Sequence, residues 1–144
     1  MKAVILTVAI PGTQALVDLC RESVRRFAPT VWHSVYWHQG THAAGIEAWR
    51  RRMMKFDDGW DVIVLLDSDV VLTSPLWAEA VIDPFQHTVL ELAGAPKLSG
   101  PVERVLYGTA TILHPSCLAM RRELFDKCDF HPKGRLLDTA GMAS

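Results

Sequence analysis

The sequence contains 144 residues, of which 49% are hydrophobic and 22% are charged. This length and balance predict a single globular domain over residues 1–144, with a core of its own. The net charge of −1 gives no reason to expect nucleic acid or an anionic membrane as a partner. No stretch approaches the roughly 20 apolar residues that span a bilayer, so we expect no membrane span.

The three cysteines, Cys20, Cys117 and Cys128, cannot form a closed set of disulfides, which favours a reducing compartment. The first ten residues resemble a minimal signal peptide. However, their apolar run is short, and Pro11-Gly12 ends it as a turn ends a strand. We therefore expect a cytoplasmic location.

The first half of the chain alternates between strand and helix patterns. The predicted elements are a strand over 3–10, a helix over 13–27, a strand over 31–37, a helix over 41–56 and a strand over 62–66. Thr13 and Thr41 are the expected N-caps. The first helix should bury Leu16, Val17, Cys20, Val24 and Phe27. The basic runs 50–52 and 121–122 are expected on solvated helix faces, and His42 is expected in a solvated first turn.

The second half is less regular. We expect a short helix from 73–75 to about 82, strands over 88–93, 109–113 and 116–120, and a brief helix over 121–126. The Gly- and Pro-rich residues 94–101 form a candidate mobile loop. The βα alternation predicts an α/β fold with a mostly parallel, twisted sheet and helices on both faces. In such sheets ligands bind beyond the carboxyl ends of the strands.

Two carboxylates follow the most apolar strand of the sequence. Val62–Leu66 is a continuous apolar run, and Asp67 and Asp69 come directly after it. Residues two apart in an extended chain point to the same side, so both carboxylates can face one point. Their repulsion predicts a divalent cation between them, with a phosphate-bearing ligand completing its shell.

In this order of elements the chain resembles the GT-A fold of nucleotide-sugar glycosyltransferases. Glu22–Pro29 looks like the first helix of family 2-type enzymes, and Leu66–Val70 matches their acidic motif. His114–Phe125 resembles the acceptor-side segment, in which a strand of small residues runs into an Arg-rich helix start. The resemblance implies a Rossmann-like GT-A domain, with a nucleotide-binding half over 1–72 and an acceptor-side half over 73–144.

The resemblance also implies a donor site. Asp67 and Asp69 would hold Mn²⁺ or Mg²⁺ against the diphosphate of a nucleotide sugar, with UDP as the expected nucleotide, and Ser68 lies between them. Ile10 and Pro11 would border the nucleotide, and His42, although expected in a solvated first turn, could reach a donor phosphate. Gln39 and Thr41 occupy the loop in which family members often carry an acidic residue. Trp37 ends the second strand at this edge and could lie near a sugar or base.

On the acceptor side, the resemblance implies a carboxylate base for inverting members. The family's Glu-Asp pair is missing here, so Asp138 is the candidate. The acceptor stays open among a glycan, a lipid, a protein and a modified nucleobase. An oligomer is compatible with the sequence.

Two other interpretations fit parts of the sequence. Haloacid dehalogenase-like phosphatases also place Asp-x-Asp after an apolar strand, with the first Asp as nucleophile and the second as general acid. The later acidic pair of that superfamily is absent here.

A zinc site is the other alternative. The spacing of zinc ligands occurs at His114, Cys117, Cys128 and His131, which would make a zinc-stapled binding module without catalysis. Against zinc, Cys117 could be a small core residue.

Overall fold

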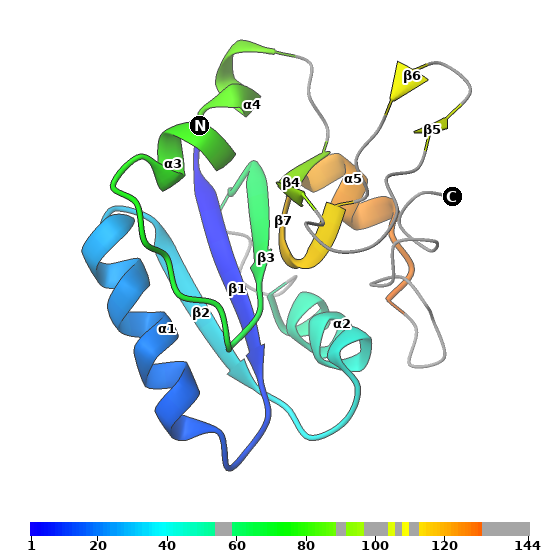
Figure 1. Ribbon diagram of the computed structural model, residues 1–144. Helices are drawn as coiled ribbons and strands as arrows, with labels where there is room; N and C mark the ends of the chain where they lie inside the picture. Colours follow the sequence, from blue (N-terminus) through cyan, green and yellow to red (C-terminus); the bar gives the residue numbers. More distant parts are fainter. Residues whose placement is uncertain (54–58, 89–91, 97–103, 106–107, 110–112, 131–144) are drawn as a thin grey trace.

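The computed structural model describes residues 1–53, 59–88, 92–96, 104–105, 108–109 and 113–130. Within these ranges a five-stranded sheet has the order β2-β1-β3-β7-β4 (Figure 1). Its strands are β1 (Ala3–Ala9), β2 (Trp32–Trp37), β3 (Val62–Leu66), β4 (Leu92–Pro96) and β7 (Leu113–Arg121). The helices are α1 (Gln14–Phe27), α2 (His42–Met53), α3 (Trp77–Val81), α4 (Pro84–His87) and α5 (Arg122–Lys127). The short strands β5 (Arg104–Val105) and β6 (Gly108–Thr109) pair separately.

The sheet is mostly parallel. β1 pairs in parallel with β2 on one side and with β3 on the other. β7 runs antiparallel to both β3 and β4, so β4 has the same direction as β3. One core cluster joins the sheet to α1 and α4, and a second joins its other face to α2 and α5. The predicted fold class is confirmed: a Rossmann-like α/β domain with helices on both faces.

The first helix differs from the prediction at its start and in its buried stripe. The Thr13 side chain makes no cap; its hydroxyl donates to the carbonyl of Ile10 at 2.7 Å and closes the β1–α1 turn. Gly12 takes a φ of +95° in that turn, a conformation that favours glycine. Leu16 is 47% exposed, so its predicted burial was wrong. The residues that α1 buries are Val17, Cys20, Ser23 and Val24.

The second helix packs closely on the opposite face. The predicted cap is confirmed, because the Ala44 amide donates to Thr41 Oγ1 at 3.1 Å. Ile46 and Trp49 are buried as predicted, whereas Phe56 lies outside the described residues. A Cβ on Gly45 would lie 2.4 Å from a methyl group of Val8. Glycine at this position therefore lets the first turn of α2 approach the carboxyl end of β1.

In the second half, the structure moves several predicted boundaries. β4 begins at Leu92 and includes Gly94–Pro96, so the predicted mobile loop begins inside a strand; residues 97–101 lie outside the described residues. β7 begins at Leu113 and extends well beyond the predicted strand over 116–120. α3 begins only at Trp77, because Ser74 first forms a turn in which its hydroxyl accepts from the Leu76 amide at 3.1 Å.

Three arginines expected in solvent instead hold the layers together. Arg50 donates through Nη1 to the carbonyls of Phe125 and Cys128 and pairs with Glu47. Arg121 donates to two carbonyls around α4 at 2.7 Å each. Arg122 lies over the Trp60 ring, 4.7 Å from its centroid. These three arginines therefore connect different parts of the fold, because a guanidinium can stack on an aromatic ring and donate hydrogen bonds at the same time.

We predict that Arg50→Met destabilises the protein by about 2 kcal/mol, because two partly buried carbonyls lose a charged donor. Arg51→Met is the matched control. The Arg51 side chain is 78% exposed, and it forms an ion pair with Glu47, which also pairs with Arg50. Its loss should therefore cost less than about 0.5 kcal/mol. Urea unfolding of the two variants measures the difference, and equal midpoints would contradict the role given to Arg50.

Candidate functional site

The carboxyl ends of three parallel strands meet at one edge of the sheet. Ala9 of β1 is paired with Trp37 of β2, and the His38 amide continues the ladder by donating to the Ala9 carbonyl at 2.8 Å. β3 ends beside β1 at Leu66. Three loops, which follow β1, β2 and β3, therefore leave the sheet side by side. This is the edge at which ligands bind in parallel α/β sheets.

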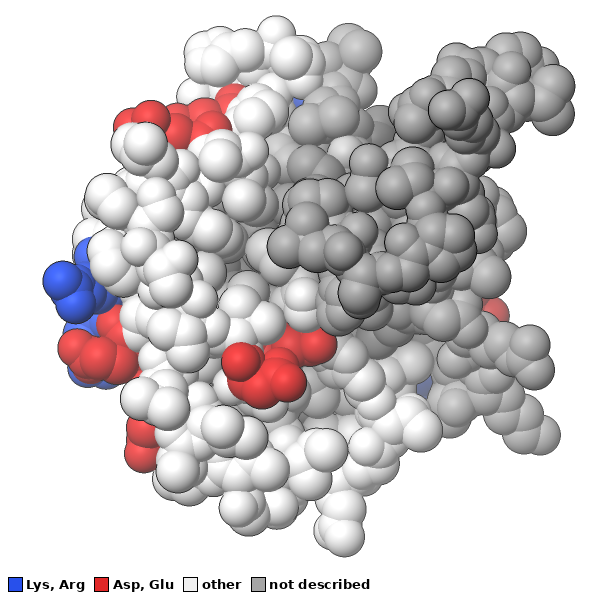
Figure 2. Space-filling model, in the orientation of Figure 1, with Lys and Arg blue, Asp and Glu red and all other residues white. Residues whose placement is uncertain are grey.

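The acidic pair lies on a tight turn at this edge. The Asp67 amide donates to the Ser116 carbonyl at 2.9 Å, and the Val70 amide donates to the Asp67 carbonyl at 3.1 Å. Asp67 and Ser68 are half-buried, and Asp69 is exposed. Figure 2 shows exposed acidic side chains where the chain leaves β3 in Figure 1. The sheet thus fixes the start of the turn while Asp69 faces solvent.

Helix α2 contributes a histidine to this turn. His42 Nδ1 lies 3.7 Å from Asp67 Oδ1, and each side chain is 32% exposed. The expectation of a solvated His42 was wrong, because the close approach of α2 to β1 brings its first turn against the acidic loop. Burial lowers the pKa of His42, and the negative charge of Asp67 offsets this in part. The net shift of the pKa is downward, which favours the neutral imidazole.

Helix α1 anchors the acidic turn from the other side. The Ser23 hydroxyl accepts from the Leu72 amide at 3.0 Å and donates to the Cys20 carbonyl at 2.8 Å. The Cys20 thiol donates to the Asp67 carbonyl at 3.8 Å. Burial raises the pKa of Cys20, so its sulfur keeps the proton that this contact needs. Neither anchoring role was predicted, because the sequence carries no sign of it beyond a small polar residue within a buried helical stripe.

The other predicted nucleotide contacts lie on the neighbouring loops. Ile10 and Pro11 are exposed after β1, and Gln39 and Thr41 are exposed after β2. The structure therefore places all four at the same edge as the acidic turn. Trp37 is 37% exposed at the end of β2. Asp138, the predicted base, lies outside the described residues.

A divalent cation fits the chemistry of the acidic turn when a ligand completes its shell. Among the described residues, no group of three or more His, Cys, Asp or Glu side chains could hold a metal ion. Asp67 and Asp69 supply carboxylate oxygens from one short turn. Mg²⁺ is commonly bound by one or two carboxylates together with substrate phosphates rather than by a cage of protein ligands. Two carboxylates on one turn are compatible with binding of this kind, in which the phosphates of a ligand supply the remaining oxygens.

The structure contradicts a zinc site that uses both cysteines. Cys117 belongs to the core cluster on the α1 face, whereas Cys128 packs against the cluster on the α2 face. The sheet therefore separates the two sulfurs. Burial raises the pKa of Cys117 to about 11, and burial also raises that of Cys128. The side chain of His114 and the whole of His131 lie outside the described residues.

Comparison with known proteins supports the fold. No family model matches the sequence, and a search of curated proteins finds no match. Among solved structures, the chain is similar to a glycosyltransferase involved in the glycosylation of the major capsid of PBCV-1, with a TM-score of 0.52 and 14% identity. The match covers 88% of this chain and 62% of that glycosyltransferase. At this identity the likeness concerns the fold.

None of the helices in the described ranges is long and apolar enough to cross a membrane.

We predict that Ser23→Ala loosens the acidic turn. The Leu72 amide is buried with this hydroxyl, and a buried donor without its acceptor costs about 1–3 kcal/mol. Hydrogen exchange at Leu72 should therefore accelerate more than exchange at Val64 in the centre of β3. Ser74→Ala, which removes an exposed turn contact, is the control. Unchanged protection of Leu72 would show that Ser23 does not hold the turn.

The stability of the protein should depend on pH through His33. His33 Nε2 lies 2.8 Å from the Thr7 hydroxyl, and burial lowers the pKa of His33 from 6.5 to about 4, with a smaller contribution from Arg21. A lowered histidine pKa means that the unfolded chain binds the proton first. The neutral His33 ring therefore makes its full contribution to the free energy of unfolding above pH 6.5. This contribution is lost as the pH falls toward 4. The unfolding free energy of the wild type should therefore fall more steeply than that of His33→Gln over this window. Parallel curves would contradict the assignment.

Proposed function

We propose that this protein is a glycosyltransferase that moves a sugar from a metal-bound nucleotide sugar to an acceptor. The observation that carries the proposal is the acidic turn at Asp67–Asp69, which follows β3 at the carboxyl edge of the sheet, next to the loop that follows β1. The fold likeness to a glycosyltransferase adds support. This edge is where a parallel α/β sheet receives a nucleotide, and a carboxylate pair suits a cation shared with a diphosphate.

In this proposal, Asp69 is the direct ligand of Mn²⁺ or Mg²⁺, and Asp67 lies nearer to the ribose or to a bound water. When bound, the cation supplies Lewis-acid stabilisation of the departing nucleoside diphosphate. The protein's part is to hold the two carboxylates in place. Ser116 and Ser23 fix the two ends of the turn through Asp67 and Leu72, so less ordering remains to be done when the donor binds.

The exposed loops on either side define the rest of the proposed donor site. Ile10 and Pro11 would border the base on one side, with Gln39 and Thr41 on the other, and Ser68 would bond the donor from within the turn. UDP is our proposed nucleotide. His42, half-buried beside Asp67, offers an imidazole that can bond a phosphate oxygen or orient the carboxylate. Asp138 remains our proposal for the catalytic base that deprotonates the acceptor. The acceptor itself is proposed only as a hydroxyl- or amine-bearing molecule.

We predict that nucleoside diphosphates and nucleotide sugars bind only with Mn²⁺ or Mg²⁺, and that Asp69→Asn weakens this binding at least tenfold. The carboxylate is the cation's ligand, and the neutral amide is a poorer one. Titration calorimetry with a nucleotide-sugar panel measures the effect. Asp61→Asn is the matched control, because Asp61 precedes the same strand at its opposite end and accepts from the Lys2 amide at 2.8 Å.

The outcomes separate the candidate functions. Metal-dependent binding that survives Asp61→Asn but not Asp69→Asn supports the transferase. Absence of nucleotide binding by the intact protein would overturn it. Metal-dependent release of phosphate from phosphomonoesters, lost in Asp67→Asn, would instead favour the phosphatase interpretation of the same two residues.

A further inference from the structure

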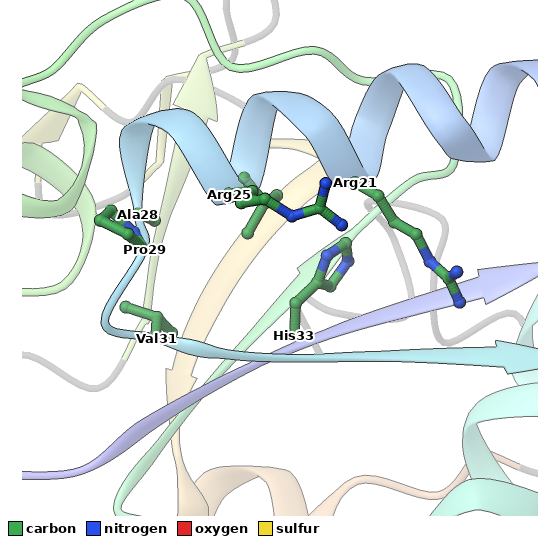
Figure 3. Close-up of a pocket in the computed structure, with 7 residues that line it drawn as sticks. Arg21, Arg25, Ala28, Pro29, Val31 and His33 are labelled. Carbon is green, nitrogen blue, oxygen red and sulfur yellow. The ribbon is translucent and has the colours of Figure 1, made fainter.

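A cleft lies between α1 and the edge strand β2. Its volume is about 280 Å³, and three basic side chains line it: Arg21, Arg25 and His33. Val24 and Val31 are among its apolar lining residues. Figure 3 shows the Arg25 guanidinium beside the His33 ring and Arg21 further along the helix. The two arginines are four residues apart, so they share one helix face.

The register of β1 and β2 separates this cleft from the carboxyl edge. His33 is paired with Ile5, whereas Trp37 at the edge is paired with Ala9. On β3, Leu65 is paired with Leu6, so the acidic turn starts about three residues, or roughly 10 Å, further along the sheet than His33, and two strands away. The cleft and the acidic turn are therefore separate places on the sheet, and they carry opposite charge.

The charge of the cleft is only partly compensated by neighbouring carboxylates. Arg21 makes no hydrogen bond or ion pair with any residue in the described part of the chain. Arg25 pairs with Glu22 at 3.0 Å, but their side chains are 73% and 69% exposed, and such pairs contribute little. Like charges four residues apart on a helix repel each other. An anion between the guanidiniums would relieve that repulsion.

His33 gives the cleft a fixed polar wall. Its Nε2 is 2.8 Å from the Thr7 hydroxyl, which holds the ring against β1. Because the pKa of His33 is about 4, the ring is neutral at pH 7, and the positive charge of the cleft comes from its arginines. The ring nevertheless has a nitrogen, Nδ1, that Thr7 does not engage.

We propose that this cleft binds a phosphoryl group, carried either by a soluble phosphate compound or by a lipid headgroup. A guanidinium offers paired donors that match two phosphate oxygens, which makes arginine the preferred residue for such recognition. The volume of about 280 Å³ lies just below the usual range for small-molecule sites, which begins near 300 Å³. It suits a phosphoryl group rather than a whole nucleotide sugar. This site is independent of the proposed transferase activity.

Titration with inorganic phosphate at constant ionic strength, followed by NMR, tests the proposal. We expect a saturable shift of the His33 ring signals, because that ring lines the cleft. The double variant Arg21→Gln/Arg25→Gln should bind phosphate at least tenfold more weakly. The matched control, Arg51→Gln/Arg52→Gln, removes the same charge from exposed positions on α2 and should bind as the wild type does.

Glu22→Gln provides a test in the opposite direction. It removes the carboxylate that competes for Arg25, so phosphate affinity should rise. Because Arg21, Glu22 and Arg25 are all exposed, thermal unfolding should show that each variant remains folded. A Glu22→Gln affinity equal to or below that of the wild type would contradict an anion seated between the two arginines.

Vesicle flotation distinguishes the two sources of the phosphoryl group. Binding to phosphatidic acid vesicles but not to phosphatidylcholine vesicles, lost in Arg21→Gln/Arg25→Gln, supports a lipid headgroup. A saturable phosphate response without vesicle binding supports a soluble compound. The proposal is overturned if neither probe binds, or if the α2 control variant weakens binding as much as the double variant does.

Discussion

The complete burial of β3 is the constraint on which the rest of the structure depends. All five of its side chains are buried, and it lies between β1 and β7 with a core cluster on each face. A strand covered on both faces can leave the sheet only at its ends. The carboxylates of Asp67 and Asp69 therefore come to the carboxyl edge as the first groups able to reach water. The same burial makes their backbone rigid, since the amide that follows Leu66 is held by β7.

Arginine has two roles in this structure, one within the fold and one at the surface, and the basic runs in the sequence do not distinguish between them. Arg50, Arg121 and Arg122 come from the runs expected in solvent, yet each reaches backbone carbonyls or an aromatic ring in another layer. Their partners are distant in sequence, so no local pattern could indicate them. Arg21 and Arg25, by contrast, remain at the surface. What decides the difference is whether a tertiary neighbour presents carbonyls within reach of the guanidinium.

The sequence predicted what depends on burial and local chemistry: the apolar β3 run, the alternation of strand and helix, and the Thr41 cap. It did not predict β4 through Gly94–Pro96, because Gly and Pro are poor strand residues and only pairing with β7 puts them in the sheet. Nor did it predict that β7 would run antiparallel. His42 gave no local sign of burial, since its neighbour Asp67 comes from another element.

The acidic turn and the basic cleft are connected through one line of contacts in the core. His33 meets the Thr7 hydroxyl at 2.8 Å, Thr7 lies 4.0 Å from the Cys20 sulfur, and that sulfur lies 3.8 Å from the Asp67 carbonyl. Two of these three contacts involve a thiol, which is a weak donor and a weak acceptor. Coupling between sites needs an element with two discrete arrangements, and β1, buried on both faces, provides none. A ligand in the cleft should therefore change the affinity of the proposed donor site very little, and the two proposed sites should act independently.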